Sequence, residues 1–213
     1  MIRTIIVCLV FMAGPAAASC DRPAPSQGNT LISPTNINQA FFNRLLTDEV
    51  SYQRCRKGLP QVRAAVNLRH VARDHSIWMA HDQTLSHTGG RRGYETLSDR
   101  FERRGLRFRR ASENIVQVWR YKLDMHRRYR VGDADNCVFS TRAGQRIDTH
   151  SYTSLARHVV DLWMKSPGHA RNIFDPYVTF HGGAVAFDPQ GSRCGHYYVT
   201  QNFWKPMRAH LRK

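Results

Sequence analysis

Acidic residues and long apolar runs are what this sequence has least of. Only 16 Asp and Glu accompany 32 Lys and Arg, so the formal net charge is +16. Beyond the first segment, Lys, Arg, Asp or His interrupts each apolar stretch before the roughly 20 residues that span a bilayer. The sequence also lacks a glycine-rich phosphate loop, an internal repeat, a nucleophile elbow and a close cysteine pair. These absences argue against a transmembrane segment, a nucleotide-binding loop, a repeat architecture and a zinc knuckle.

The first 18 residues have the order of a cleavable export signal. A positive start at 1–3 precedes an apolar run over 5–13, and Ala16-Ala17-Ala18 fits the small-residue rule for signal peptidase. We therefore expect residues 1–18 to be a signal peptide and the protein to be exported, either periplasmic or secreted. The alternative is a lipoprotein modified at Cys20, but Ala17 departs from the Leu usual three residues before such a cysteine.

Four cysteines remain after the signal, namely Cys20, Cys55, Cys137 and Cys194. An even number in an exported chain predicts two disulfides, and four thiols allow three pairings. The sequence does not choose among these pairings.

Positive charge is concentrated in the middle of the chain. Residues 91–130 contain 13 Lys and Arg and five Asp and Glu. Such a field attracts anionic partners, for which an envelope polymer, a lipid or a glycan are the candidates in an exported protein. Nucleic acid is disfavoured because residues 91–110 lack interleaved aromatic residues and no DNA-binding motif is visible.

Hydrophobic periodicity predicts helices and late strands, and hence an α+β fold. After a mobile arm at 19–35, one domain is expected over 36–205, followed by a basic tail at 206–213. Helices are predicted at 36–54, around 68–79, at 94–104 and at 151–165. Strands are predicted at 115–119, 182–187 and 196–204, and residues 120–150 are expected to form an insertion or long loop.

Four short motifs follow one another in this predicted framework. They are LSHT at 85–88, SENI at 112–115, WMKSPGHARNI at 163–173 and YYVTQNF at 197–203. Together they resemble the bacterial SCP/CAP domains, relatives of the cysteine-rich secretory, antigen 5 and pathogenesis-related proteins, over about residues 38–204. This resemblance implies a three-layer α-β-α sandwich with a small antiparallel sheet and a cleft that contains His87, Glu113 and His169.

The sequence departs from the family pattern at two positions. Ser166 stands where eukaryotic members carry a second cleft glutamate, so the fourth group of the family's tetrad is absent. Ser112 replaces the usual Gly before Glu113, and a turn that needs a positive φ would be strained or reshaped there.

Two imidazoles and one carboxylate support three kinds of chemistry. His87, Glu113 and His169 could bind a divalent metal, zinc being the best match to these ligands, and activate a water. They could instead form a metal-free acid–base cluster, or a polar network that only positions loops.

Other polar residues have less specific interpretations. His75 lies on the apolar stripe of its helix and is expected to be a satisfied core residue. His181 could reach the cleft, and Asn172 is expected to bond to backbone in its turn.

Three functions are consistent with these observations. The first is an exported binding module for an envelope or extracellular molecule. The second is a metal-assisted, peptidase-like hydrolase with His87, Glu113 and His169 as candidate catalytic residues. The third is a structural domain with a relict cleft. The missing second glutamate argues against catalysis, and the basic charge argues for a binding function.

Overall fold

The structure is a computed structural model that describes residues 20–22 and 29–207 of the 213-residue chain. The predicted signal peptide at 1–18 and nearly all of the predicted basic tail at 206–213 lie outside the described residues. Among the helices of the described part, none is long and apolar enough to cross a membrane.

A four-stranded sheet forms the middle layer, in the order β1-β5-β6-β2. The three long strands are β2 (Phe108–Trp119), β5 (Phe180–Asp188) and β6 (His196–Pro206). They pair antiparallel, whereas the two-residue β1 (Arg63–Ala64) pairs parallel with the start of β5. The expected small antiparallel sheet is thus confirmed, with this short parallel addition.

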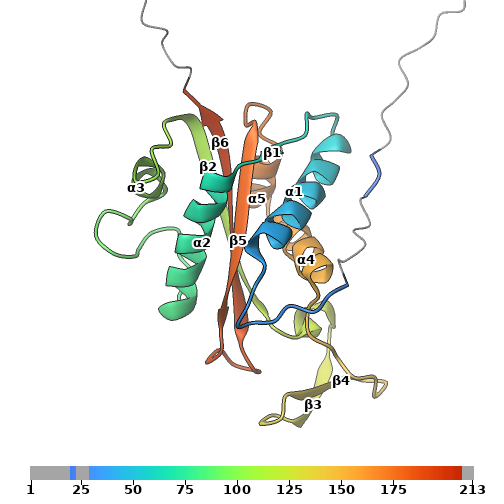
Figure 1. Cartoon of the computed structure of the whole chain (residues 1–213). Coiled ribbons are helices and arrows are strands. Elements are labelled where there is room, and N and C mark those ends of the chain that lie inside the picture. The colour runs from blue at the N-terminus through green and yellow to red at the C-terminus, as the bar shows by residue number, and fades with distance from the viewer. Residues whose placement is uncertain (1–19, 23–28, 208–213) are drawn as a thin grey trace, which may run out of the picture.

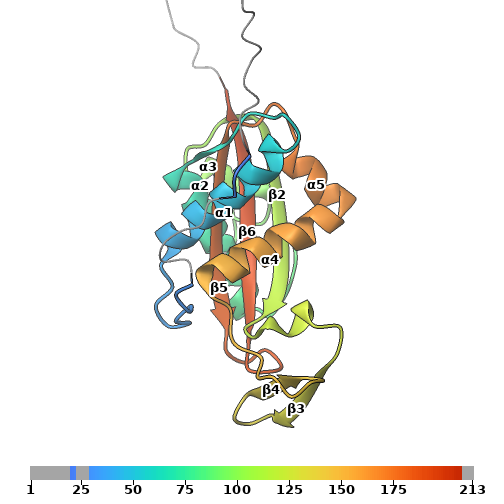
Figure 2. The ribbon, with the colours of Figure 1, turned by 90° about the vertical axis from the view of Figure 1, so that its right-hand side faces the viewer.

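Helices cover both faces of the sheet, which confirms the three-layer sandwich (Figures 1 and 2). α2 (Val66–His81) and α3 (Leu97–Glu102) lie on one face. α1 (Gln39–Cys55), α4 (Tyr152–Lys165) and α5 (Pro167–Ile173) lie on the other.

Local signals explain where several helices begin. Ser151 starts α4 with a reciprocal capping box to Ser154, and Thr96 starts α3 in the same way with Asp99. The helix predicted at 151–165 corresponds to α4, but the sequence does not predict α5 after it. Pro167 occupies the first turn of this new helix, where its missing N–H would have no intrahelical partner anyway.

Two glycines of β5 allow the helices of both layers to approach the sheet closely. A Cβ on Gly182 would collide with the backbone of α2 at Leu68, and a Cβ on Gly183 would collide with the Leu46 side chain of α1. On the α1 and α4 side, the largest core side chain is Trp163, whose indole Nε1 donates to the Ile115 carbonyl at 3.1 Å. This bond ties α4 to β2 immediately after Glu113.

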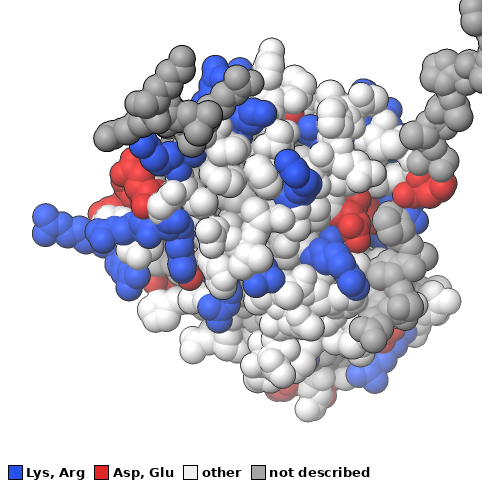
Figure 3. All heavy atoms as spheres, turned by 45° about the horizontal axis from the view of Figure 1, so that its top comes forward, with Lys and Arg blue, Asp and Glu red and all other residues white. Residues whose placement is uncertain are grey.

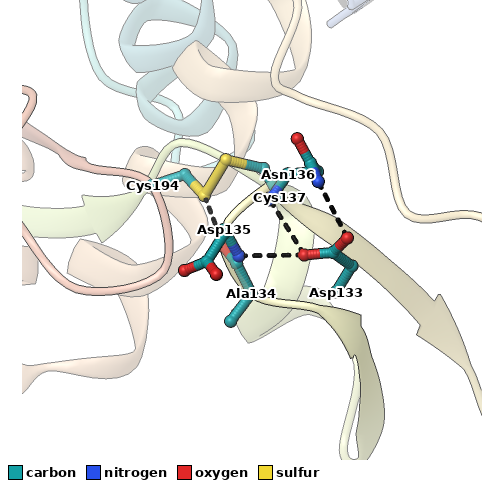
Figure 4. Close-up of a disulfide and its surroundings, with 6 residues drawn as sticks. All are labelled: Asp133, Ala134, Asp135, Asn136, Cys137 and Cys194. Carbon is teal, nitrogen blue, oxygen red and sulfur yellow. Dashed lines mark hydrogen bonds between the residues drawn. A yellow bond between two sulfur atoms is a disulfide. The ribbon is translucent and has the colours of Figure 1, made fainter.

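Residues 120–150 form an ordered insertion instead of a featureless loop. It contains a 3-10 turn (Lys122–Met125) and a hairpin of β3 (Tyr129–Asp133) and β4 (Val138–Thr141). A small apolar cluster that includes Leu123 and Phe139 supports it. The Cys137–Cys194 disulfide ties the hairpin turn to the β5–β6 connection, and Asp133 accepts backbone N–H bonds inside that turn (Figure 4).

The described part of the expected arm is attached to the domain at several points. Cys20 forms a disulfide with Cys55 at the end of α1, and Arg22 forms an ion pair with Glu49 at 2.9 Å. Ile32 is buried in the main core. A cysteine whose sulfur is in a disulfide cannot also carry a lipid thioether, so this pairing weighs against lipidation at Cys20.

Candidate functional site

Glu113 is the centre of a buried charged cluster between the sheet and the α2–α3 layer. Arg100 of α3 donates from one Nη atom to both carboxylate oxygens, each at 2.9 Å. Both side chains are 3% exposed. Arg100 also approaches the backbone carbonyls of His87, Tyr94 and Glu95. The guanidinium therefore neutralises Glu113 and holds the 87–95 loop at the same time.

His87 is the partner of Glu113 that reaches solvent. Its Nδ1 lies 3.0 Å from Glu113 Oε1, and its side chain is 53% exposed. A carboxylate only accepts hydrogen bonds, so Nδ1 carries the proton in this contact and Nε2 is left for other partners. The carboxylate thus selects the tautomer of an accessible imidazole.

His75 of α2 lies behind this pair. Its Nε2 is 2.9 Å from the Ser86 carbonyl and 3.7 Å from Glu113 Oε1. A carbonyl accepts only, so Nε2 carries the proton. Burial lowers the pKa of His75 to about 4, against the opposing influence of Glu113. His75 is thus a neutral, hydrogen-bonded core residue, as the sequence predicted, and its proximity to Glu113 was not foreseen.

His169 stands at the first turn of α5, half-buried. Partial burial lowers the pKa of His169, and the charge of His87 lowers it further. Of the three predicted site residues, His87 and Glu113 are in direct contact, whereas His169 is only near enough for the charge of His87 to affect it.

A chain of buried amides positions α5 and hence His169. Asn172 Nδ2 donates to Asn114 Oδ1 at 2.8 Å and to the Glu113 carbonyl at 3.2 Å. Asn114 Nδ2 in turn donates to the His169 carbonyl at 3.2 Å and to Gln201 Oε1 at 2.8 Å. Asn172 therefore bonds to backbone, but to that of β2 and not, as expected, to that of its own turn.

The same chain continues across the sheet to His181, away from the cleft. Gln201 Nε2 lies 3.1 Å from His181 Nε2, and His181 Nδ1 lies 2.8 Å from the Thr47 hydroxyl. An amide nitrogen only donates, so His181 accepts at Nε2 and donates from Nδ1. Complete burial lowers its pKa to about 3. His181 therefore belongs to a structural network, and the idea that it reaches the cleft is not supported.

The role of Arg100 was not predicted from the sequence, and the backbone at Ser112 differs from the prediction. Arg100 is one arginine in a basic stretch, and only its place on α3 distinguishes it as the buried partner of Glu113. Ser112 lies within β2 and is not among the residues with positive φ, so the strain expected there is absent. The strand simply continues through this position.

The arrangement does not fit a divalent metal at Glu113. Both carboxylate oxygens already accept from Arg100, and a fixed guanidinium at this distance repels a cation. Within residues 20–22 and 29–207, no group of three or more His, Cys, Asp and Glu side chains could hold a metal ion. We therefore derive no chemical step through a metal.

Comparisons with known proteins agree with this architecture. The family model described as the cysteine-rich secretory protein family (CAP) matches residues 47–203. No curated protein matches the chain.

Two solved structures share the fold at low sequence identity. An extracellular SCP-domain protein from Bacillus anthracis has a TM-score of 0.52 and 21% identity, over 77% of this chain and 40% of that protein. An outer surface protein from Borrelia burgdorferi has a TM-score of 0.52 and 16% identity, over 77% of this chain and 92% of that one.

Proposed function

The chain belongs to the cysteine-rich secretory protein (CAP) family, and from this we propose that it is an exported binding module for an anionic polymer of the cell envelope. Two disulfides support an oxidising compartment. The predicted signal peptide supports export, to the periplasm or out of the cell. The two structural relatives are an extracellular protein and an outer surface protein, which agrees with this assignment.

The observation that carries the proposal is the contact between Arg100 and Glu113. A general base must accept a proton, and a metal ligand must offer a lone pair. Glu113 instead neutralises a buried guanidinium, which already bonds to both of its oxygens. The cleft is thus better suited to holding its loops and presenting His87 than to hydrolysis.

The surface around α3 supplies the attraction for an anionic partner. Seven arginines of residues 91–110 are exposed, and within the described part of the chain only Arg104 and Arg110 among them form ion pairs, with Asp74 and Asp175. Figure 3 shows Lys and Arg side chains spread over one face of the molecule, with fewer Asp and Glu. Charges of one sign on one face steer and hold a polyanion.

Heparin, a polyanionic glycan, is a suitable first probe, followed by purified envelope polymer. Binding should weaken by about tenfold or more between 50 and 200 mM salt. The triple reversal Arg92→Glu/Arg107→Glu/Arg109→Glu should remove most of the binding. Arg44→Glu/Arg56→Glu/Lys57→Glu makes the same charge change on α1 and just after its end and should retain more of it. Salt-independent binding, or equal loss in both triple variants, would refute the proposal.

The alternative is a hydrolase, peptidase-like, that uses His87, Glu113 and His169. It is favoured by one observation, an accessible imidazole whose tautomer is set by a carboxylate, next to a second imidazole. A zinc titration by calorimetry, together with peptide hydrolysis with and without chelator, tests it. Zinc binding and hydrolysis that both vanish in His87→Ala/His169→Ala would establish this alternative, and their absence in the parent protein would exclude it.

A further inference from the structure

A separate cavity of about 430 Å³ lies between α2, α3 and the loop that joins them. This volume is within the roughly 300–1,000 Å³ of small-molecule sites. His87, Glu113 and His169 do not line it. Instead its walls include His75 and Arg100, which also lie against the buried carboxylate of Glu113.

A glycine-rich segment of the loop forms the wall of the cavity that lies against Trp78. Gly89, Gly90 and Gly93 have φ values of +132°, +114° and +81°, which side chains rarely adopt. A Cβ on Gly89 would also collide with the Trp78 indole. On its other side, the indole stacks on His75, with ring centroids 5.3 Å apart. Trp78 is therefore a fixed, half-buried aromatic wall.

Tyr94 provides a second aromatic wall that is held by cations. The Arg91 guanidinium lies 4.3 Å from the Tyr94 ring centroid, and that of Arg103 lies 5.5 Å away. Arg103 also donates to the Gly93 carbonyl at 3.3 Å. These contacts hold the loop against the end of α3.

The charges that line the cavity favour an anion. Arg91, Arg100 and Arg104 line it together with one acid, Asp74. Arg104 is paired with Asp74 at 2.6 Å and Arg100 with the buried Glu113, so Arg91 carries the positive charge that no carboxylate in the described part of the chain neutralises.

We infer that this cavity binds a small planar anion, an aromatic ring that carries a carboxylate or sulfonate group. The ring lies in the cavity beside Trp78 and Tyr94, and the anionic group accepts from Arg91. This site goes beyond the polymer-binding surface, because Arg92, Arg107 and Arg109 do not line the cavity.

The test uses 8-anilinonaphthalene-1-sulfonate as the probe and the full mature protein. Calorimetry gives its affinity, and a heteronuclear NMR titration locates it. We expect the largest shifts at the Trp78 indole and at Gly89 and Gly90. The uncharged analogue N-phenyl-1-naphthylamine should bind about tenfold more weakly, because it lacks the group that pairs with arginine.

Matched variants separate the cavity from general surface charge. Arg91→Gln should weaken sulfonate binding about tenfold, whereas Arg92→Gln, the same change at the exposed neighbour, should leave it within about twofold. Tyr94→Leu should also weaken binding while near-UV circular dichroism confirms the native fold. Equal losses in Arg91→Gln and Arg92→Gln, equal binding of the neutral analogue, or NMR shifts confined to other surfaces would each overturn the inference. None of these outcomes depends on heparin binding, so the two proposals fail independently.

Discussion

At the scale of single residues, Arg100 decides what Glu113 can do. In the sequence, a carboxylate predicted beside two imidazoles indicates a reactive site. In the fold, a buried guanidinium occupies both of its oxygens. A buried pair of this kind is costly to break because the remaining charge has no water to solvate it.

Removing Glu113 alone should therefore destabilise the fold. We expect Glu113→Ala to lower the free energy of unfolding by about 3–5 kcal/mol, measured by urea denaturation. The double variant Glu113→Leu/Arg100→Leu should recover most of this loss, because no unpaired charge remains. Glu102→Ala, at an exposed position of α3, is the control. A double variant less stable than Glu113→Ala would contradict the explanation.

Buried neutral histidines should make the fold sensitive to acid. The folded-state pKa of His181 is about 3, below the ordinary value of 6.5. Between these values the unfolded chain binds the proton and the folded chain does not, so stability is full above pH 6.5 and falls as the pH drops toward 3. His75 acts in the same direction, with a pKa of about 4.

For His181 alone, the loss between pH 7 and pH 5 is about 2 kcal/mol. We expect His181→Gln to reduce the pH dependence of the unfolding free energy by about this amount over that range. His81→Gln, at a side chain 84% exposed, is the control for losing an imidazole. An unchanged pH dependence in His181→Gln would show that the buried histidine is not responsible.

At the scale of elements, β5 connects the layers. Its outer edge is paired with β1 only at Phe180 and His181. Further along, side-chain amides of α1 take over the pairing. Gln39 bonds to both the N–H and the carbonyl of Val185, and Asn43 accepts from Gly183 N at 2.7 Å. These bonds protect an edge that could otherwise pair with another chain.

The contact of α2 with β5 requires glycine at position 182. Gly182→Ala would place a methyl group against the α2 backbone, which cannot move as a side chain can. We expect a loss of at least about 2 kcal/mol in thermal or urea unfolding. Gly168→Ala, in α5, meets nothing closer than 3.9 Å and should be neutral or stabilising by up to about 1 kcal/mol. Similar effects of the two substitutions would argue against close packing at position 182.

At the scale of the whole molecule, the Cys137–Cys194 disulfide is the covalent cross-link between the insertion at 120–150 and the sandwich. Cys137 and Cys194 are 57 residues apart in sequence. The insertion's own apolar cluster is small, so the disulfide carries much of its attachment, together with the contact between Asp124 and His158 of α4 at 3.0 Å.

Without this disulfide, the insertion should unfold before the rest of the domain does. We expect Cys137→Ser/Cys194→Ser to lose about 2–4 kcal/mol and to be cut by trypsin first at Arg127, Arg128 or Arg130. Cys20→Ser/Cys55→Ser should leave cleavage at these arginines unchanged. Mass spectrometry of the early fragments distinguishes the two variants. Equal cleavage patterns would mean that the insertion does not depend on its disulfide.

The sequence by itself determined the fold class, most elements and one of the site contacts. Apolar periodicity predicted α1, α2, α4, β5 and β6, because one buried face repeats regularly along each element. Its motifs predicted that His87 would meet Glu113. The family assignment also followed from four ordered motifs.

Only the tertiary structure decided what the site contains. β2 begins at Phe108, well before the predicted start at 115, because pairing with β6 extends a segment that has exposed arginines and no clear alternation. Likewise, nothing local marks Arg100 as the buried arginine or pairs Cys20 with Cys55. Such choices depend on which distant surfaces the sandwich brings together, and a sequence pattern records only the burial of each element.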